Sequence, residues 1–385
     1  MATAAVTASV EDGFAGLPAL RNAWGSLFRE YCSEPSSSFE WTMALLRHHL
    51  RPDDRCFVVR LQRAGTLVGI VPLVCRSLRV LGQPIRLLAP VSEQYNTHSD
   101  LLIDASDAGV VKAFVDVLPK VPTRWDCFRL ARLLEGHPLV GALQRELSAS
   151  GQLQWQRQGL PAYVLDLPSS YDEYLAARSA KFRNHLKRVE RKLHDAGAVA
   201  IQDVAATRDP DAAYEAVLHI EQRSWKQGHG SSITAVERQT GFYRDLATGA
   251  LEAGRLHLQW LTLDGHPAAY NLGYLTARGY HYLKTSYDHG YRALSPSTWL
   301  RARLIQSLIE RGVSRFDFPG EPYAWETQWT SDVRWRVVLS VYARTVRGRL
   351  LAAADRWKHR GDHRQVRHVD PRRPHAHTAR EMAFA

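Results

Sequence analysis

The most regular pattern of apolar and polar positions lies between residues 256 and 318. Three runs there alternate apolar and polar residues as half-buried strands do: 256–261, 268–275 and 280–287. Asp264-Gly265, between the first two runs, predicts a tight hairpin turn. A helical apolar spacing then covers 300–309, and a fourth alternating run ends at Phe318. The pattern therefore predicts an antiparallel meander followed by a helix and a fourth strand.

The start of this helix is a specific prediction. In Ser295-Pro296-Ser297-Thr298, a serine stands at the N-cap and a proline at the first helical position, and Arg311-Gly312 ends the helix. A helix that starts at a sheet edge presents backbone N–H groups and the positive end of its dipole. Such a place suits the phosphates of a bound cofactor.

The first half of the chain contains the same kinds of element. Helices are expected at 24–31, 39–50 and 110–118, and strands at 56–61, 67–74, 80–88, 101–103 and 127–130. The hairpin over 56–74 is the counterpart of the one over 256–275. We therefore expect a mixed α/β (α+β) fold of two similar domains, 1–150 and 151–350, each a mostly antiparallel sheet flanked by helices.

Charge adds one feature. The net charge of +11 favours an acidic partner such as a nucleotide cofactor, an anionic saccharide, RNA or a membrane face. Much of it falls on a predicted helix, 178–194, whose apolar stripe is Phe182, Leu186, Val189 and Leu193. Lys181, Arg188 and Lys192 flank one side of that stripe, and Arg183 and Lys187 flank the other. This basic face is either a solvated surface or an anion-binding one.

Several classes of protein are not indicated. The four cysteines lack metal-ligand or disulfide spacing, so no metal is expected. No apolar run approaches the roughly 18–20 residues of a transmembrane segment, and the N-terminus lacks a secretory apolar region. Residues 351–385, rich in Arg, His and Pro, are expected to form a disordered basic tail. We expect a cytoplasmic protein.

Short motifs in the second half occur in a recognisable order: Ser179–Arg188, Glu221–Lys226, Phe242-Tyr243, Tyr287-Asp288, Ser295–Ser297 and Asp317–Gly320. With these motifs, residues 169–343 resemble the GNAT-type acyltransferase domain of cellulose and exopolysaccharide biosynthesis proteins and of Fem-type aminoacyl transferases. The resemblance implies two tandem GNAT-like domains, the first one degenerate. It also implies a cytoplasmic enzyme that moves an acyl group from a thioester, such as acetyl-CoA or another acyl-CoA, or from an acyl-tRNA, to an amine.

The chain departs from that family pattern at three places. Many members continue past the glycine with a Tyr-Lys pair and a Trp, whereas Tyr323 is followed here by Ala324-Trp325-Glu326. Pro296-Ser297 replaces Pro-Gly at the helix start, and a complete QxxGxG/A pyrophosphate loop is absent from the sequence. These departures bear on which acyl donor is bound more than on the expected fold.

Acyl transfer to an amine sets the catalytic candidates. The amine, with a pKa of about 10, must lose a proton to a carboxylate or a tyrosine–water chain, and the oxyanion needs N–H donors near a splayed strand. The candidates at strand ends are Asp317, Tyr287, Asp288, Glu321 and Tyr323. Asp317 could equally be an acid satisfied by an arginine, and Tyr287 could be a packed side chain.

Binding candidates fall into two groups. The helix start, with Arg292, Ser295, Ser297, Thr298 and Arg301, would hold the donor phosphates. An anionic acceptor or donor headgroup would meet Lys181, Arg183, Arg188 and Lys192, with Trp225 and Trp325 lining a sugar or acyl channel. Glu221, near Trp225-Lys226, is explained equally well by a salt bridge to Arg or Lys.

The sequence thus favours an N-acyltransferase that acts on an amino sugar or another amine in envelope or polysaccharide assembly. Two alternatives stay open. One is the Fem-type reaction with aminoacyl-tRNA as donor. The other is a non-catalytic scaffold that binds polysaccharide synthase components through the Trp-rich loop 323–335.

Overall fold

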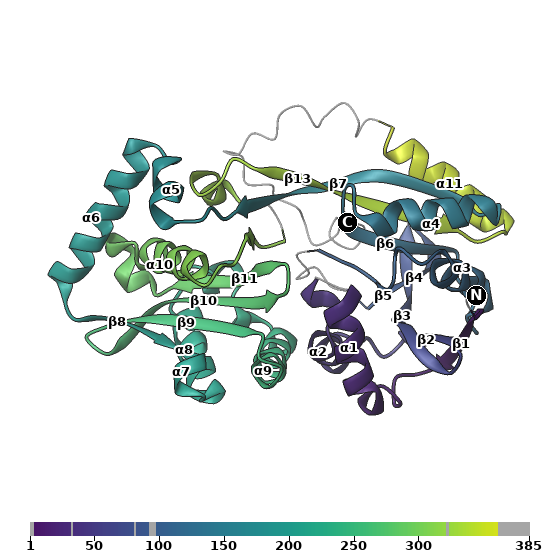
Figure 1. Ribbon diagram of the computed structural model, residues 1–385, viewed down its shortest axis with the longest axis horizontal. Helices are drawn as coiled ribbons and strands as arrows, with labels where there is room; N and C mark the ends of the chain where they lie inside the picture. Colours follow the sequence, from purple (N-terminus) through teal and green to yellow (C-terminus); the bar gives the residue numbers. More distant parts are fainter. Residues whose placement is uncertain (1–3, 32–33, 81, 92–97, 321–322, 361–385) are drawn as a thin grey trace. The chain divides into compact units, whose positions relative to one another are not determined.

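The chain folds into two compact units. The computed structural model describes residues 4–31, 34–80, 82–91, 98–320 and 323–360 (Figure 1). Unit 1 comprises Met1–Leu46, Leu50–Ala162 and Arg334–Ala385, and unit 2 comprises Arg47–His49 and Tyr163–Val333. The predicted boundaries at residues 150 and 350 did not include this return of the chain into unit 1 at Arg334.

Unit 1 is built on a mixed sheet. Its strands are β1 (Val6–Asp12), β2 (Arg55–Arg63), β3 (Thr66–Val80), β4 (Gln83–Pro90), β5 (Leu102–Ile103), β6 (Cys127–Leu134), β7 (Leu153–Asp166) and β13 (Val333–Tyr342). The order is β1-β2-β3-β4-β6-β13-β7, with β5 beside β3. Neighbours are antiparallel from β1 to β4, whereas β4 and β6 run parallel at Leu87↔Cys127 and Leu88↔Phe128.

Helices cover both faces of the unit 1 sheet. They are α1 (Arg21–Tyr31), α2 (Phe39–His48), α3 (Ala108–Val117), α4 (Pro138–Ala149) and α11 (Val346–Lys358), with short 3-10 turns at Pro18–Leu20, Pro35–Ser37 and Leu118–Lys120. Phe114 of α3 and Leu143 of α4 share one apolar core with Phe128 of β6. Because side chains alternate along a strand, the neighbouring Cys127 faces the other way.

Helix α11 corrects the predicted tail. Leu351 and Ala352 are buried against Ile85, Cys127 and Tyr342, on the face of the sheet that Cys127 occupies. This burial keeps the chain helical to Lys358, beyond the predicted start of the tail at residue 351. Residues 361–385, the rest of that tail, lie outside the described residues.

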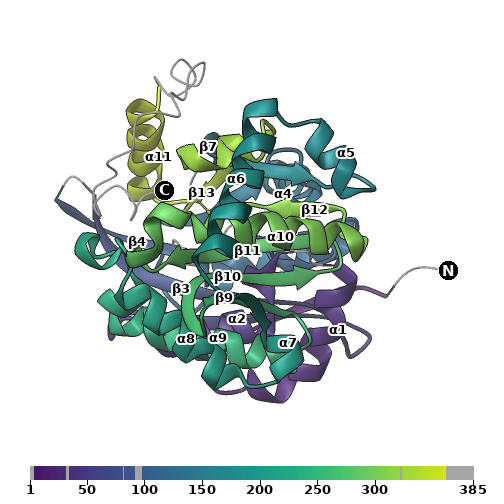
Figure 2. The same cartoon turned by 90° about the vertical axis from the view of Figure 1, so that its left-hand side faces the viewer.

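Unit 2 contains the predicted meander. Its strands are β8 (Val199–Asp203), β9 (Leu256–Leu263), β10 (His266–Thr276), β11 (Gly279–Tyr287) and β12 (Arg315–Asp317), together with the end of β7. The order is β7-β12-β11-β10-β9-β8. Figure 2 shows the part of it from β12 to β9. The β9–β10 turn has Asp264 at φ 50° and Gly265 at φ 80°, which is the left-handed backbone that a two-residue hairpin turn needs.

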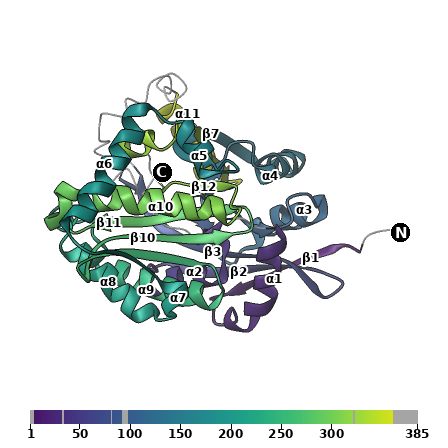
Figure 3. The same ribbon diagram turned by 60° about the vertical axis from the view of Figure 1, so that its left-hand side comes forward.

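Helices flank the unit 2 sheet on both faces. They are α5 (Tyr171–Ala176), α6 (Ala180–Ala196), α7 (Val204–Thr207), α8 (Pro210–Gln222), α9 (Glu237–Glu252) and α10 (Pro296–Glu310), with 3-10 turns at Gln227–His229, Ile233–Ala235, His289–Leu294 and Ala324–Gln328. Leu300 of α10 packs with Ala269 of β10, whereas the next residue, Tyr270, contacts α8. Helices α10 and α8 therefore cover opposite faces of these strands (Figure 3).

The two units share a connection. In each, a helix joins two parallel neighbours after an antiparallel meander, as β4–α3–β6 and as β11–α10–β12. The fold is thus the predicted mixed α/β arrangement of mostly antiparallel sheets flanked by helices. Among the described helices, none is both long and apolar enough to cross a membrane.

Candidate active site

The site centres on a strand edge along which β12 does not continue the pairing. The parallel pairing of β11 with β12 consists of Tyr280↔Phe316 and His281↔Asp317. Directly afterwards the chain turns to β7, where the N–H of Phe318 donates to the carbonyl of Tyr163 at 3.1 Å. Strand β11 continues to Tyr287, and residues 282–287 have no strand partner on this side among the described residues. We call this stretch the open edge of β11.

A β-bulge lies at the start of the open edge. Leu272 pairs with Lys284 but Gly273 pairs with Tyr282, so Leu283 is the extra residue of β11. Gly273 fits the bulge because a Cβ there would lie 2.1 Å from the Tyr280 ring. A bulge redirects the side chains on either side of it. Polar groups gather on both faces of the sheet beside it.

The first polar group, the α10-side cluster, consists of Asn271, Tyr282, Arg301 and Trp325. The Tyr282 hydroxyl donates to Oδ1 of Asn271, and Nε of Arg301 lies 3.3 Å from that hydroxyl. The Asn271 side chain is fully buried, and within the described part of the chain its Nδ2 has no hydrogen-bond partner. A buried amide with a spare N–H is a donor available to a ligand oxygen.

Arg301 lies within this cluster rather than at the helix start, where the sequence analysis placed it. Its side chain is 5% exposed, and its guanidinium lies 4.0 Å from the ring centre of Trp325 and 5.2 Å from that of Trp329. The helical period explains the difference, because position 301 shares the buried face of α10 with Ile305 and Leu308. Arg301 therefore lies beside Tyr282 at the open edge of β11, and contacts with aromatic rings hold it there.

The second polar group, the α8-side cluster, surrounds Glu221 on the opposite face. One carboxylate oxygen accepts from the Tyr270 hydroxyl at 2.5 Å and from Nζ of Lys226 at 3.3 Å, and the other accepts from the N–H of Ile233 at 2.9 Å. Lys226 also donates to the carbonyl of Thr285 on β11. The salt-bridge interpretation of Glu221 is therefore the one that the geometry matches.

Lys284 completes the α8-side cluster. Its Nζ lies 3.3 Å from the carbonyl of Ser231 and 5.3 Å from the ring centre of Tyr243. Burial, with repulsion from Lys226, lowers its pKa to about 8, although Glu221 opposes the change. Burial alone would raise the pKa of Glu221, but the two lysines and its hydrogen bonds outweigh burial and hold the pKa below its usual value.

The start of α10 is present but differs from the predicted cap. Ser295 stands at the N-cap in a left-handed conformation, φ 52° and ψ 49°, and makes no side-chain cap within the described chain. A capping serine normally has an extended backbone, which explains why its hydroxyl does not reach the helix N–H groups. Ser297 and Thr298 are half-buried at this helix start, and Arg292 is exposed in the preceding turn.

Two predicted acids are engaged in ion pairs. Asp317 is buried, and its Oδ1 accepts from Nε and Nη2 of Arg315 at 2.8 and 2.6 Å, while its Oδ2 lies 3.5 Å from Nδ1 of His281. The geometry matches the interpretation of Asp317 as an arginine-satisfied acid. Asp288 accepts from the N–H of Gly290 at 2.8 Å and pairs with Arg223.

The remaining candidates differ in their surroundings. Tyr287 packs beside α10 with Trp299 and Leu300. Tyr323 is half exposed, and its N–H donates to Oε2 of the buried Glu326 at 3.1 Å. Glu321 lies outside the described residues.

Most of the basic face of α6 is exposed. Lys181, Lys187, Arg188, Arg191 and Lys192 are all exposed, and Glu190, the acid among them, pairs with Arg303. Arg183 instead turns back to the carbonyls of Leu175 and Arg178 at the end of α5. The side chain of Trp225, on the α8 side, is 45% exposed.

Among the predicted site residues, the structure brings Arg301 and Trp325 together, and it groups Arg292 with Ser295, Ser297 and Thr298 near the start of α10. The sequence analysis missed Asn271, Tyr282 and Lys284. A signal was present, because Asn271 interrupts an otherwise apolar stretch of β10. Within the described residues, no three His, Cys, Asp or Glu side chains form a metal-binding group.

Comparison with protein families matches one segment of the chain. Residues 180–327, which contain both polar clusters and the start of α10, match the family model of the acetyltransferase (GNAT) domain. Residues 180–327 are therefore similar to a GNAT-type acetyltransferase domain. Comparison of the sequence with curated proteins finds no match.

Three solved structures share the fold at low sequence identity. FemX has 10% identity and a TM-score of 0.58 over 82% of this chain and 95% of its own. A protein of unknown function from Bacteroides thetaiotaomicron has 13% identity and a TM-score of 0.53, over 87% of this chain and 100% of its own. The C-terminal domain of a putative lysylphosphatidylglycerol synthetase from Agrobacterium fabrum has 12% identity and a TM-score of 0.52, over 88% of this chain and 96% of its own. At such identities the likeness concerns the fold.

Proposed function

We propose that this chain is an N-acyltransferase that transfers an acyl group from an acyl-CoA thioester, such as acetyl-CoA, to an amine. The observation that carries the proposal is the open edge of β11, which leads through a short turn to a helix start without a side-chain cap. Both features lie within the residues that match the GNAT domain. An uncovered strand edge can pair with amide groups of an extended ligand, and a helix start favours phosphates.

The donor would lie along these two features. Arg292, Ser297 and Thr298 would hold its phosphates, together with backbone N–H groups at the start of α10. Amide groups of the donor would pair with backbone groups of residues 282–287. Arg301 and Nδ2 of Asn271 would face the acyl end, because both are buried donors beside Tyr282.

The reaction then needs one proton acceptor and one proton donor. The amine nitrogen attacks the thioester carbonyl carbon, and its proton passes to a base. That base would be Tyr323 acting through water, because it is the most exposed of the described candidates. Backbone N–H groups of the open edge would stabilise the tetrahedral oxyanion. The C–S bond breaks, and Tyr287 would protonate the leaving thiolate, giving an amide and the free CoA thiol.

The acceptor would carry negative charge as well as an amine. The basic face of α6 and the net charge of +11 favour an anionic molecule, such as a saccharide intermediate of polysaccharide or envelope assembly. Synthase components that hold such an intermediate are the proposed partners. The reaction would take place in the cytoplasm, where acyl-CoA is available.

The donor site can be tested by calorimetry and by thiol release. We expect acetyl-CoA or a longer acyl-CoA to bind, and Arg292→Ala to raise Kd about tenfold, since it removes one charge-assisted phosphate contact. Arg278→Ala is the matched control, because Arg278 is also exposed but lies in the β10–β11 turn. An unchanged Kd for Arg292→Ala would remove this donor site. Binding without thiol release for any amine would favour a non-catalytic scaffold.

A Fem-type reaction with aminoacyl-tRNA as donor is the second candidate. The exposed basic face of α6 favours it, since a polyanion would meet five like-charged side chains on one helix. Lys187→Glu with Arg191→Glu should then weaken tRNA binding strongly and reduce its salt dependence. If this pair leaves tRNA affinity unchanged, the α6 face does not bind tRNA, and the acyl-CoA proposal stands independently.

A further inference from the structure

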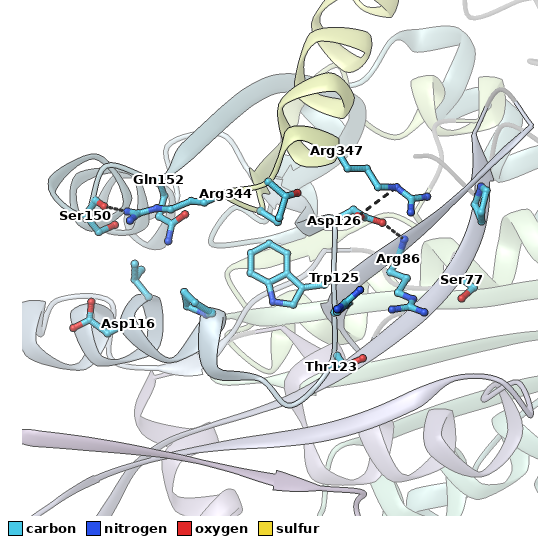
Figure 4. Close-up of a pocket in the computed structure, with 16 residues that line it drawn as sticks. Ser77, Arg86, Asp116, Thr123, Trp125, Asp126, Ser150, Gln152, Arg344 and Arg347 are labelled. Atoms are coloured by element: carbon cyan, nitrogen blue, oxygen red, sulfur yellow. Dashed lines mark hydrogen bonds and ion pairs between the residues drawn. The ribbon is translucent and has the colours of Figure 1, made fainter.

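Unit 1 contains a large cavity that the proposed reaction does not use. Its volume is about 980 Å³, which lies in the range of small-molecule sites. It is formed by strands β3 and β4, the ends of α3 and α4, the loop before β6 and the start of α11 (Figure 4). All of these elements belong to unit 1, so the cavity is separate from the α10 site.

Arginines dominate the lining. Four arginines contribute four positive charges around one cavity: Arg86 of β4, Arg124 of the loop before β6, Arg344 of the connection between β13 and α11, and Arg347 of α11. Two aspartates also line it, but both have cationic partners. Asp126 lies 3.6 Å from Nε of Arg347, and Asp116 pairs with Lys112 at 2.5 Å. The lining is therefore positive overall.

Two of the four guanidinium groups are available to a ligand. Arg344 donates to the carbonyl of Ser150, and Arg347 faces Asp126. The side chains of Arg86 and Arg124 form no hydrogen bond or ion pair with other described residues, and both are exposed. The backbone of Arg86 is engaged instead: its N–H donates to Oδ2 of Asp126 at 2.8 Å, and its carbonyl accepts from the N–H of Asp126 at 2.9 Å. Guanidinium groups that form no ion pair with the aspartates of the lining favour the binding of an anion.

The remaining lining is rigid and complements such an anion. Helix α11 begins at the cavity, where the side chain of Thr345 caps the N–H of Gly348 at 3.1 Å, and its dipole adds positive potential. The indole N–H of Trp125 donates to the carbonyl of Leu118 at 3.2 Å, which fixes the ring in the lining. Ser77 and Thr123 add hydroxyl groups. The cavity can thus contact phosphate oxygens and a flat ring at once.

We infer that this cavity binds a small phosphorylated molecule with more than one negative charge, such as a nucleoside diphosphate. The concave shape and single-ligand volume favour a small molecule over a nucleic-acid strand, which would need an extended basic surface. The arginines would contact the phosphates, and Trp125 would contact the base.

Calorimetry with pyrophosphate and ADP tests this inference on the full-length chain. We expect Arg86→Ala with Arg124→Ala to weaken both ligands about tenfold or more, because two charged donors are lost. Arg29→Ala with Arg79→Ala is the matched control, since both arginines are exposed in unit 1 and neither lines the cavity. This control pair should bind like the unaltered chain.

The design separates this site from the donor site. ADP is also part of CoA, so the measurement is repeated in the Ser295→Asp background, where binding at the α10 site should be weakened and cavity binding should persist. Acyl-CoA binding should be unchanged by the Arg86 and Arg124 substitutions. The inference is overturned if the cavity pair and the control pair bind ADP equally well, or if only an oligonucleotide binds and pyrophosphate does not displace it.

Discussion

The starts of α3 and α10 occupy equivalent places in the two units but are built differently. At α3, Asp107 caps the helix by accepting from Gly109 and Val110 at 2.9 and 3.2 Å, and it pairs with Arg63 at 2.5 Å. At α10, Ser295 makes no side-chain cap among the described residues. One helix start therefore already contains a carboxylate, whereas the other has no side-chain cap among the described residues. Under the proposed function, only the start of α10 would be open to a phosphate.

The strands that precede α3 and α10 also differ, because one packs in an apolar core and the other against ionic side chains. Leu88 of β4 lies in an entirely apolar core with Leu73, Phe128 and Leu339. Strand β11 is backed instead by the ionic α8-side cluster, and Lys226 donates directly to the carbonyl of Thr285. Burying charges costs free energy unless they are paired, so this arrangement is weak evidence for stability as such. We relate it to holding the open edge of β11 in place.

The largest expected effect concerns the support of β11. Glu221→Ala would leave the partly buried Lys226 and Lys284 without their carboxylate, and we expect a loss of about 3–5 kcal/mol in the free energy of unfolding. Denaturant titration measures it. Leu88→Ala, the apolar counterpart in unit 1, should cost about 2–5 kcal/mol with little pH dependence. Equal pH profiles for the two variants would contradict the comparison.

The next effect concerns the helix starts. Ser295→Asp would place at α10 the carboxylate that α3 already has, and we expect acyl-CoA binding to weaken by about tenfold to a hundredfold through charge repulsion. Ser295→Asn is the control, because asparagine has the same shape without the charge and tolerates the left-handed backbone. Calorimetry compares the two. Similar losses for both variants would show that shape, not charge, is responsible.

A smaller effect is expected from Tyr282→Phe. The change removes the hydroxyl between Asn271 and Arg301, and should lower the free energy of unfolding by about 1–2 kcal/mol because two buried partners lose a hydrogen bond. Thiol release should also slow, with a larger change in kcat than in KM. Tyr280→Phe, in the neighbouring core, serves as control. If kcat is retained, the α10-side cluster does not contact the reacting atoms.

A pH dependence of stability is expected from Lys284. Burial lowers its pKa from 10.5 to about 8, so between these values the unfolded chain binds the proton and the folded chain does not. The free energy of unfolding therefore rises with pH between about 8 and 10.5. Below pH 8 the charged Lys284 lowers the free energy of unfolding by its full amount. Lys284→Met should be more stable than the unaltered chain near pH 7, and the difference in free energy of unfolding should narrow toward pH 10.5. Lys187→Met, on the exposed face of α6, should show no such change.

Local signals in the sequence explain which parts of the fold were predictable. The β9–β11 meander and α10 were predicted because alternation, Asp264-Gly265 and Pro296 act within a few residues. Strand β13 was not predicted, since its place between β6 and β7 depends on partners far away in sequence. Strand β1 was missed for the same reason.

The site was predictable only in part. The position of α10 followed from the sequence, but the direction of Arg301 did not, because its burial depends on Trp325 and Trp329 meeting α10. Asp317 and Arg315 are two residues apart and point to the same side of β12, so their pairing could have been inferred from strand alternation. The Tyr282–Asn271 contact crosses a bulge and could not.

The position of β13 has a consequence for synthesis. The sheet of unit 1 lacks its strand between β6 and β7 until residues 333–342 leave the ribosome, after all of unit 2. At roughly 5–20 residues per second, the wait from residue 162 lasts on the order of ten seconds or more. During that interval the backbone N–H and C=O groups of β6 that later pair with β13 can pair with strands of other chains. A truncated chain ending at residue 162 should therefore aggregate, and adding a peptide of residues 333–342 should rescue it.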